Sequence, residues 1–83
     1  MYNFIMNKYF GVRLKELRSE KQLTQGQVAT IFGVSKTTIC QWETQKQEAS
    51  LDDVVKIAIY FGVTTDYLLG LEDETGGYPP VAP

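Results

Sequence analysis

The sequence has no histidine and only one cysteine, which removes most of the chemistry by which small proteins catalyse reactions or bind metals. Without histidine there is no imidazole base for a Ser-His-Asp triad. Cys40 alone forms no CxxC redox pair, no paired-cysteine zinc site and no intrachain disulfide. The sequence also has no glycine-rich loop ahead of a predicted helix. We therefore expect no enzymatic activity, no metal, no cofactor and no small-molecule substrate.

Long hydrophobic runs are also missing, because none approaches the roughly 20 apolar residues that span a bilayer. Residues 1–10 carry Lys8 as their only charge, with no basic opening and no long apolar stretch, so no signal peptide is expected. A single unpaired cysteine fits a reducing compartment. The expected location is cytoplasmic, without contact to a membrane.

What remains is the composition of a small folded domain. The chain has 83 residues, of which 43% are hydrophobic and 22% charged. A chain this short buries about 60 to 65% of its unfolded surface, which is enough for one core and too little for two.

The formal net charge of −2 hides an uneven distribution of charge along the chain. Residues 1–46 contain seven lysines and arginines against three acidic residues, whereas residues 47–83 contain one against seven. The first half is therefore suited to face an anion, although an ordinary solvated surface gives a similar count.

Apolar periodicity and capping residues predict five helices and no strands. The first helix is expected over 10–21, where apolar residues recur at i, i+4 and i+7. Thr24 and Gln27 form a capping box for a second helix, which ends at Phe32. Its expected buried face consists of Val28, Ala29, Ile31 and Phe32. Gly33 is placed for the turn and Ser35 for the cap of a third helix, which runs through Ile39 and Trp42. The fold class is therefore all-α.

The second half of the chain continues this pattern. Ser50 caps a helix over 51–61 that has almost no polar face, so this helix is expected either at the centre of the core or shared with a partner. A short helix follows Thr64 or Thr65 and runs through Leu69. The predicted organisation is an N-terminal arm over 1–9, one domain over 10–71, and a flexible tail over 72–83 that is rich in proline and glycine.

The segment from Gln25 to Trp42 has the residue sizes that two short, steeply crossing helices need. Ala29 is small at the closest approach, Gly33 lies in the turn, and Val34 and Ile39 fill the angle. This is a helix-turn-helix pattern. The two stretches TQGQVATIFGVSKTTICQWE and LDDVVKIAIYFGVTTDYLLG resemble the lambda repressor and Cro-like (XRE) helix-turn-helix family. The resemblance extends from Arg13 to Gly70, about seven-tenths of the chain.

The resemblance implies a compact five-helix DNA-binding domain and assigns roles to individual residues. Gln25 matches the family's phosphate-contacting glutamine. On the third helix, Lys36, Thr37 and Gln41 are expected to read base edges, because a cation, a hydroxyl with a methyl group and a bidentate amide suit guanine, thymine and adenine. The residues expected to contact phosphate or to have mixed roles are Gln25, Ser35, Thr38 and Lys46. Ser35 and Thr38 have capping as their alternative role.

Four further residues are expected to support the structure or to have no direct role in binding. Arg18 and Glu43 match positions that form an ion pair between the first and third helices. Trp42, three residues after Ile39, is expected in the core. Cys40 is expected to be a small residue beside the reading face. The loop after Glu43 lacks the family's usual Asn-Gly, basic residues and proline, so fewer phosphate contacts are expected there.

The sequence thus predicts a sequence-specific transcriptional regulator that binds double-stranded DNA. A repressor that occupies a palindromic operator as a homodimer is favoured over an activator. The alternative is an antitoxin or antirepressor that uses the same fold to bind a protein. The dimer surface is expected to use apolar residues of the last two helices and of the aromatic N-terminal stretch: Ile57, Ile59, Tyr60, Tyr67, Leu68, Leu69 and Leu71, with Tyr2, Phe4, Ile5, Tyr9 and Phe10.

Overall fold

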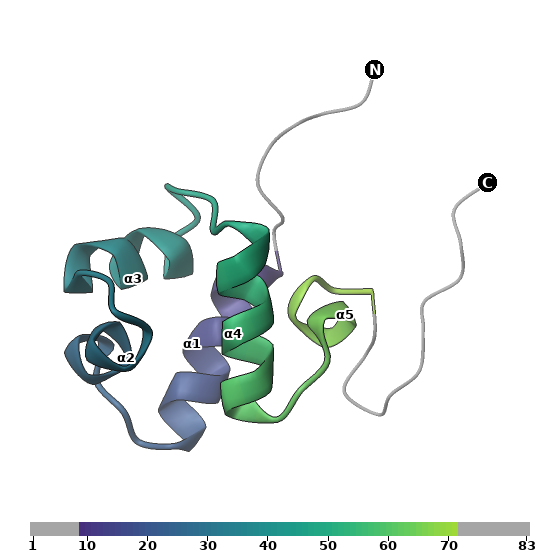
Figure 1. Cartoon of the computed structure of the whole chain (residues 1–83), viewed down its shortest axis with the longest axis horizontal. Helices are drawn as coiled ribbons and strands as arrows, with labels where there is room; N and C mark the ends of the chain where they lie inside the picture. The colour runs from purple at the N-terminus through teal and green to yellow at the C-terminus, as the bar shows by residue number, and fades with distance from the viewer. Residues whose placement is uncertain (1–8, 72–83) are drawn as a thin grey trace.

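The computed structural model describes residues 9–71, which form five α-helices and no strand. The expected all-α, five-helix fold is confirmed. Figure 1 shows α2 and α3 on one side of α4, and α5 on the other side. The helices are α1 (Phe10–Glu20), α2 (Gln25–Phe32), α3 (Lys36–Glu43), α4 (Leu51–Phe61) and α5 (Thr65–Leu68). The predicted tail over 72–83 and all of the predicted arm except Tyr9 lie outside the described residues.

The helix ends follow from side chains that cap them. The Thr24 hydroxyl accepts the N–H of Gln27 at 3.0 Å, and the Gln27 amide oxygen accepts the N–H of Thr24 at 2.8 Å, which is the predicted capping box. The turns after α2 and α4 use Gly33 and Gly62 in the left-handed region, at φ of 70° and 69°. Side-chain caps also begin the other helices after α1, at Ser35, Ser50 and Thr64.

The predicted boundaries hold to within one residue. α1 ends at Glu20 rather than at Lys21, and α5 ends at Leu68 rather than at Leu69. Such differences are ordinary at helix ends, where the last turn departs gradually from helical geometry.

Side chains from every helix meet in one hydrophobic core. Its fully buried centre is formed by Leu14, Val28, Ile39, Ile57 and Leu68, one from each helix. Trp42 is 2% exposed and packs edge-on against Phe10, with ring centroids 6.2 Å apart, so its expected core position is confirmed. The remaining buried apolar residues are Leu17, Ala29, Val54, Ala58 and Phe61.

α4 buries one face and exposes the other. Its buried positions are Val54, Ile57, Ala58 and Phe61, whereas Leu51, Val55, Ile59 and Tyr60 are exposed. The charged residues Asp52 and Lys56 of this helix lie on the side opposite Val54, Ala58 and Phe61, but the helix has more apolar residues than its inner face holds.

Several expected positions are therefore wrong. Ile57, Leu68 and Phe10 were assigned to a dimer surface, but they lie inside the core and none is more than 6% exposed. Ile31 was assigned to the buried face of α2, but it is 41% exposed. α2 is only two turns long and packs on α3 through Val28 and Ala29, which leaves Ile31 at the edge of the contact.

The beginning of α1 is fixed between α3 and α5. Gly11 lies so close to the end of α3 that an added Cβ would be 2.7 Å from the carbonyl oxygen of Glu43, and closer still to that of Trp42. On the other side, the Arg13 guanidinium donates to the carbonyl oxygen of Tyr67 and lies 4.3 Å from the centre of the Tyr67 ring. None of the helices in residues 9–71 is long and apolar enough to cross a membrane.

Two glycine-to-alanine substitutions should have opposite effects on stability. Gly11→Ala should lower the free energy of unfolding by about 1 to 3 kcal/mol, because the new methyl group meets backbone atoms of α3 that cannot rotate away. Gly26→Ala should raise it by up to about 1 kcal/mol, because the nearest atom to its Cβ is the Thr24 hydroxyl at 3.8 Å and alanine favours a helix.

Urea unfolding of both variants and the parent measures these changes. Equal effects of the same sign would contradict the close approach of α1 to α3.

Candidate nucleic-acid interface

α3 turns one face inward and presents the other to solvent. Ile39, Trp42 and Glu43 are buried, and they fix the rotation of the helix about its axis. Of the three residues expected to read bases, Lys36 and Thr37 are exposed and Gln41 is half-buried. Thr37 and Gln41, four residues apart, share the face opposite the buried side, and Lys36 is exposed next to it at the start of the helix.

The first turn of α3 uses two of the expected site residues for its own cap. The Ser35 hydroxyl accepts the N–H of Thr38 at 3.1 Å, and the two hydroxyl oxygens lie 2.9 Å apart in a hydrogen bond. Ser35 thus performs the capping role that was its alternative. Both side chains lie at the edge of the exposed face, where hydroxyl groups have capacity for a further hydrogen bond.

The chain after α3 folds back onto the end of the helix. Gln45 has a φ of 61°, in the left-handed region, and the N–H of Lys46 donates to the carbonyl oxygen of Gln41 at 2.8 Å. The backbone of Lys46 is thereby held next to Gln41. The side chain of Lys46 is exposed.

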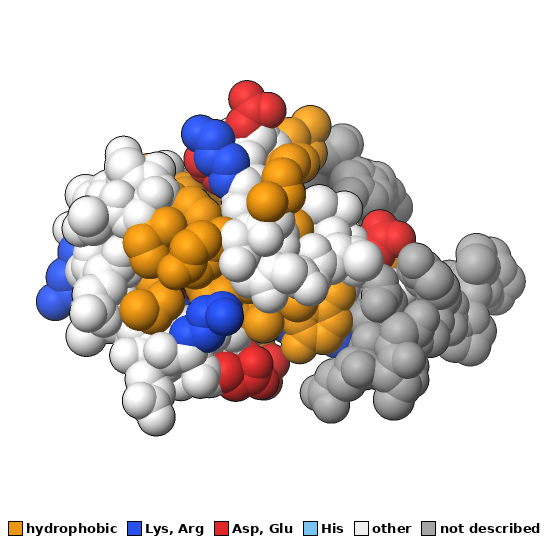
Figure 2. Space-filling model, turned by 60° about the horizontal axis from the view of Figure 1, so that its bottom comes forward, with side chains coloured by type: hydrophobic (Ala, Val, Ile, Leu, Met, Phe, Trp, Pro, Cys, Tyr) orange, Lys and Arg blue, Asp and Glu red, His pale blue; other side chains and the backbone are white. Residues whose placement is uncertain are grey.

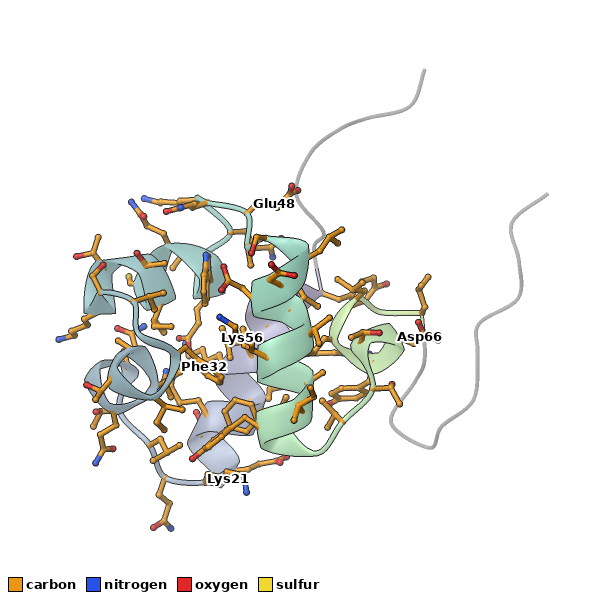
Figure 3. All side chains as sticks on the ribbon, viewed as in Figure 1. Lys21, Phe32, Glu48, Lys56 and Asp66 are labelled. Carbon is orange, nitrogen blue, oxygen red and sulfur yellow. The ribbon has the colours of Figure 1, made fainter. Side chains whose placement is uncertain are left out.

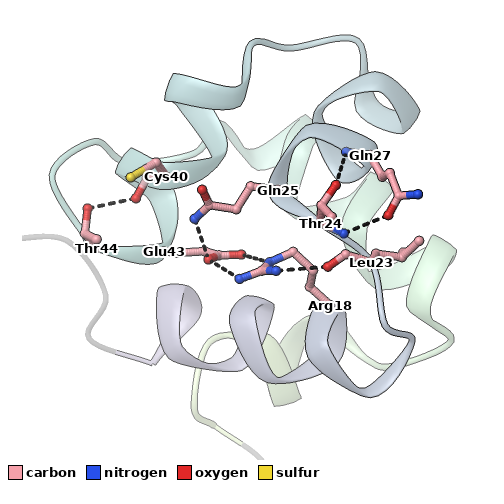
Figure 4. Close-up of polar contacts among 8 residues, drawn as sticks. All are labelled: Arg18, Leu23, Thr24, Gln25, Gln27, Cys40, Glu43 and Thr44. Atoms are coloured by element: carbon pink, nitrogen blue, oxygen red, sulfur yellow. Dashed lines mark hydrogen bonds and ion pairs between the residues drawn. The ribbon is translucent and has the colours of Figure 1, made fainter.

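Glu43 is the buried charge of the described domain, and its carboxylate joins three helices (Figure 4). The Arg18 guanidinium of α1 binds it in bidentate fashion, with Nε to Oε2 at 2.6 Å and Nη2 to Oε1 at 3.0 Å. The expected Arg18–Glu43 ion pair is confirmed, and the two side chains are only 14% and 1% exposed. The hydrogen bond to Glu43 is the main cause that raises the pKa of Arg18, so the guanidinium stays charged at physiological pH.

Gln25 completes this cluster from the first turn of α2. Its Nε2 donates to Oε1 of Glu43 at 3.0 Å (Figure 4). A carboxylate without its proton only accepts hydrogen bonds, so this contact fixes which end of the Gln25 amide faces Glu43. The expected phosphate-contacting glutamine is thus held next to α3 by a charge that the sequence reasoning had paired only with Arg18.

Cys40, which was expected beside the reading face of α3, is exposed. Thr44, the C-cap, was left out by sequence reasoning and is exposed seven residues after Thr37. The Thr44 hydroxyl donates to the carbonyl oxygen of Cys40 at 2.8 Å. Residues seven apart in a helix lie two turns apart on one face, so the spacing from Thr37 is the signal in the sequence that identifies Thr44.

The charges around this face have one sign. Between Thr24 and Lys46 the chain has two lysines and one acidic residue, and that residue is Glu43, neutralised by Arg18. The exposed charges of α2, α3 and the following turn are therefore those of Lys36 and Lys46. Among residues 9–71, no group of three or more His, Cys, Asp or Glu side chains is placed to hold a metal ion.

Comparison with known proteins identifies the same element. A family model described as helix-turn-helix matches residues 14–68. The chain is similar to the HTH-type transcriptional activator BcrR of Enterococcus faecalis, with 39% identity over 64 residues, and to the cryptic phage CTXphi transcriptional repressor RstR of Vibrio cholerae, with 37% identity over 54 residues. These matches cover 77% and 65% of this chain. The chain spans 31% of BcrR and 49% of RstR, so it corresponds to a part of each relative.

A solved structure with the same arrangement is that of the P22 c2 repressor protein in complex with a synthetic operator. The TM-score is 0.69 at 26% sequence identity, and the match covers 75% of this chain and 94% of the other.

Removing the carboxylate of Glu43 should destabilise the domain more than removing any exposed acid. Glu43→Ala should lower the free energy of unfolding by about 3 to 5 kcal/mol, because it leaves the partly buried Arg18 guanidinium without its partner. Arg18→Ala combined with Glu43→Ala should cost less than the sum of the single changes.

Urea unfolding of the single and double variants measures this coupling. Glu43→Gln, which keeps a side-chain acceptor, serves where the alanine variant does not fold, and Glu48→Ala is the control at an exposed acid. Strictly additive effects would contradict a structural pair.

Proposed function

Because this chain belongs to the lambda repressor and Cro-like helix-turn-helix family, we propose that it is a transcriptional regulator that binds double-stranded DNA sequence-specifically through α3. One observation carries the proposal: the only buried carboxylate among the described residues holds α1, α2 and α3 together and turns the polar face of α3 outward. A helix presented in this way fits the major groove of B-DNA.

The side chains of α3 have different roles in this proposal. Gln41 and Lys36 supply the hydrogen bonds that distinguish bases, Gln41 as a bidentate amide for adenine and Lys36 as a donor to guanine. Thr37 lies between them on the exposed face and contacts a base edge or a thymine methyl group. Cys40 and Thr44 are on the same face, so both lie against the DNA in the complex.

Gln25 anchors the domain to a phosphate. Its Nε2 carries two hydrogens, and one of them is directed at Glu43, which leaves the second for a phosphate oxygen. The backbone N–H groups of the first turn of α2 lie at the positive end of that helix and add to the attraction. Such contacts position the protein without reading sequence.

Lys46 is the second anchor, with Ser35 and Thr38 as mixed contacts at the start of α3. Because Lys46 follows α3 and its backbone is tied to Gln41, its ammonium reaches the phosphates that flank the bases read by α3. Two exposed lysines supply little electrostatic affinity, so a single domain is a weak DNA binder.

This weakness favours a homodimer on a palindromic operator. One helix-turn-helix contacts only half of such a site, and two half-sites about 34 to 36 Å apart place two copies on the same face of the duplex. The second copy doubles the number of base contacts, because the same residues of its α3 contact the second half-site. We propose repression by occupancy of the operator. The protein-binding alternative, an antitoxin or antirepressor, would need no DNA contact by α3.

Substitutions at Gln41 and Lys46 should separate base reading from phosphate binding. The preferred DNA sequence is first selected from a random pool with the purified chain. On that site, Gln41→Ala should cost about 1 to 3 kcal/mol and relax the preference at one base pair. Lys46→Ala should weaken binding to all sequences alike and reduce the salt slope by about 1.

The matched control is Gln47→Ala, which removes an exposed glutamine outside α3. If the Gln41 variant binds selected and scrambled DNA as the parent does, α3 does not read bases through this residue.

The homodimer should appear as two protomers on each operator. Sedimentation of the chain with a palindromic duplex measures this stoichiometry. Inserting about 5 base pairs between the half-sites should abolish the joint binding, because half a helical turn moves the second half-site to the opposite face of the duplex. A single protomer on each palindrome, with no effect of the insertion, would rule out the dimeric mode and leave recognition by one domain.

A further inference from the structure

The outer face of α4 carries a row of exposed aliphatic side chains. Leu51, Val55 and Ile59 follow each other at intervals of four residues and are 81%, 46% and 75% exposed. Residues at this spacing lie one turn apart along a single helix face. The row therefore runs along the whole length of α4, on the side away from the core residues Ile57 and Phe61.

Two opposite charges accompany this row. Asp52 and Lys56 are exposed, and each immediately follows an aliphatic residue of the row, so the two charges lie one turn apart along its flank. Within residues 9–71, neither of them has an ion-pair partner.

From these observations we propose that the outer face of α4 binds a second copy of this chain, with the two α4 helices antiparallel. The inference rests on the homodimer of the proposed function and assigns its surface. The two-fold axis crosses the helices at Val55. Leu51 of each copy then packs against Ile59 of the other, and Val55 packs against its own counterpart.

The charges select this antiparallel arrangement. With the axis at Val55, Asp52 of each copy faces Lys56 of the other, which forms two equivalent ion pairs on the same flank of the interface. In a parallel arrangement the charged flanks of the two copies would lie on opposite sides of the interface, so that Asp52 and Lys56 would meet no charge of the other copy. The Asp52–Lys56 pairs therefore form only in the antiparallel arrangement, in which the helix dipoles also oppose each other favourably.

The neighbouring surface continues the contact beyond the charged pair. A shallow groove of about 450 Å³ between α2 and α4 is lined by Ile31, Phe32, Lys56, Ile59 and Tyr60. Figure 3 shows Lys56 extending from α4 toward Phe32 of α2, and Figure 2 shows hydrophobic side chains gathered in separate patches near basic side chains on one face. The second copy thus meets apolar surface on both sides of the Asp52–Lys56 pairs.

This arrangement leaves the DNA-reading helices available. In Figure 1, α4 lies in front of α1 and α3 lies to its left, so the side of α4 that is turned away from α1 is directed toward the viewer. The proposed two-fold axis lies in the plane of this face and is perpendicular to α4. It therefore reverses the direction of α4 in the second copy but leaves α3 on the same side of α4. Both α3 helices therefore lie on the same side of the dimer, as binding to one duplex requires.

Charge reversal tests the pairing directly. Lys56→Asp and Asp52→Lys, each alone, should weaken dimerisation by at least about tenfold, because each variant places like charges together. An equimolar mixture of the two single variants should dimerise as the parent does, and so should the double variant. Sedimentation equilibrium of the full chain at concentrations on the order of 10 µM measures these constants.

A matched pair of valine substitutions tests the aliphatic row. Val55→Ser should weaken the dimer to a similar extent, whereas Val12→Ser changes a valine of α1 with a similar exposure, 50%, and should have no effect. Each variant is also measured on a duplex with one half-site, where unchanged binding shows that the domain is folded and α3 intact.

The outcomes distinguish the surface from the dimer itself. If the parent dimerises and none of these substitutions weakens the dimer, the α4 surface is wrong and the homodimer still stands. Single variants that dissociate without recovery in the mixture overturn the antiparallel pairing. A parent that stays monomeric, both free and on a palindromic operator, overturns this inference and the homodimer together.

Discussion

The carboxylate of Glu43 is the constraint on which the geometry of this domain depends. It is nearly inaccessible to solvent, so its charge has to be balanced inside the protein. Arg18 of α1 balances it with two hydrogen bonds, and Gln25 of α2 adds a third. One side chain at the end of α3 therefore fixes the position of that helix against two others, and with it the orientation of the polar face that we assign to DNA.

The close approach of α1 to α3 comes from the same region of the fold. Gly11 of α1 lies against the backbone at the end of α3. Seven residues further along α1, Arg18 binds Glu43 at the same end of α3. A short domain has few core residues, so backbone contact and a buried ion pair contribute what a larger apolar core would otherwise supply. The cost of such a pair is its desolvation, and its benefit is a single defined arrangement of the three helices.

The surface divides into two regions of different chemistry. The exposed face of α3 is polar and carries lysine, threonine and glutamine side chains, while the outer face of α4 is aliphatic with one opposite charge pair. The two faces are on different helices, so a second copy on α4 does not compete with DNA on α3.

The sequence by itself determined what depends on neighbouring residues: the five helices, their caps at Thr24, Ser35 and Ser50, and the left-handed turn at Gly33. These features need only a few consecutive residues, and the resemblance to a known family added the pairing of Arg18 with Glu43. The third partner, Gln25, and the exposure of Leu51, Val55 and Ile59 on α4 were decided only by the tertiary structure. Helix 51–61 has eight apolar residues out of eleven, which is more than one inner face holds, so the packing of the other helices decides which of them stay exposed. The contact of Gln25 with a carboxylate 18 positions away exists only when α2 and α3 are packed together.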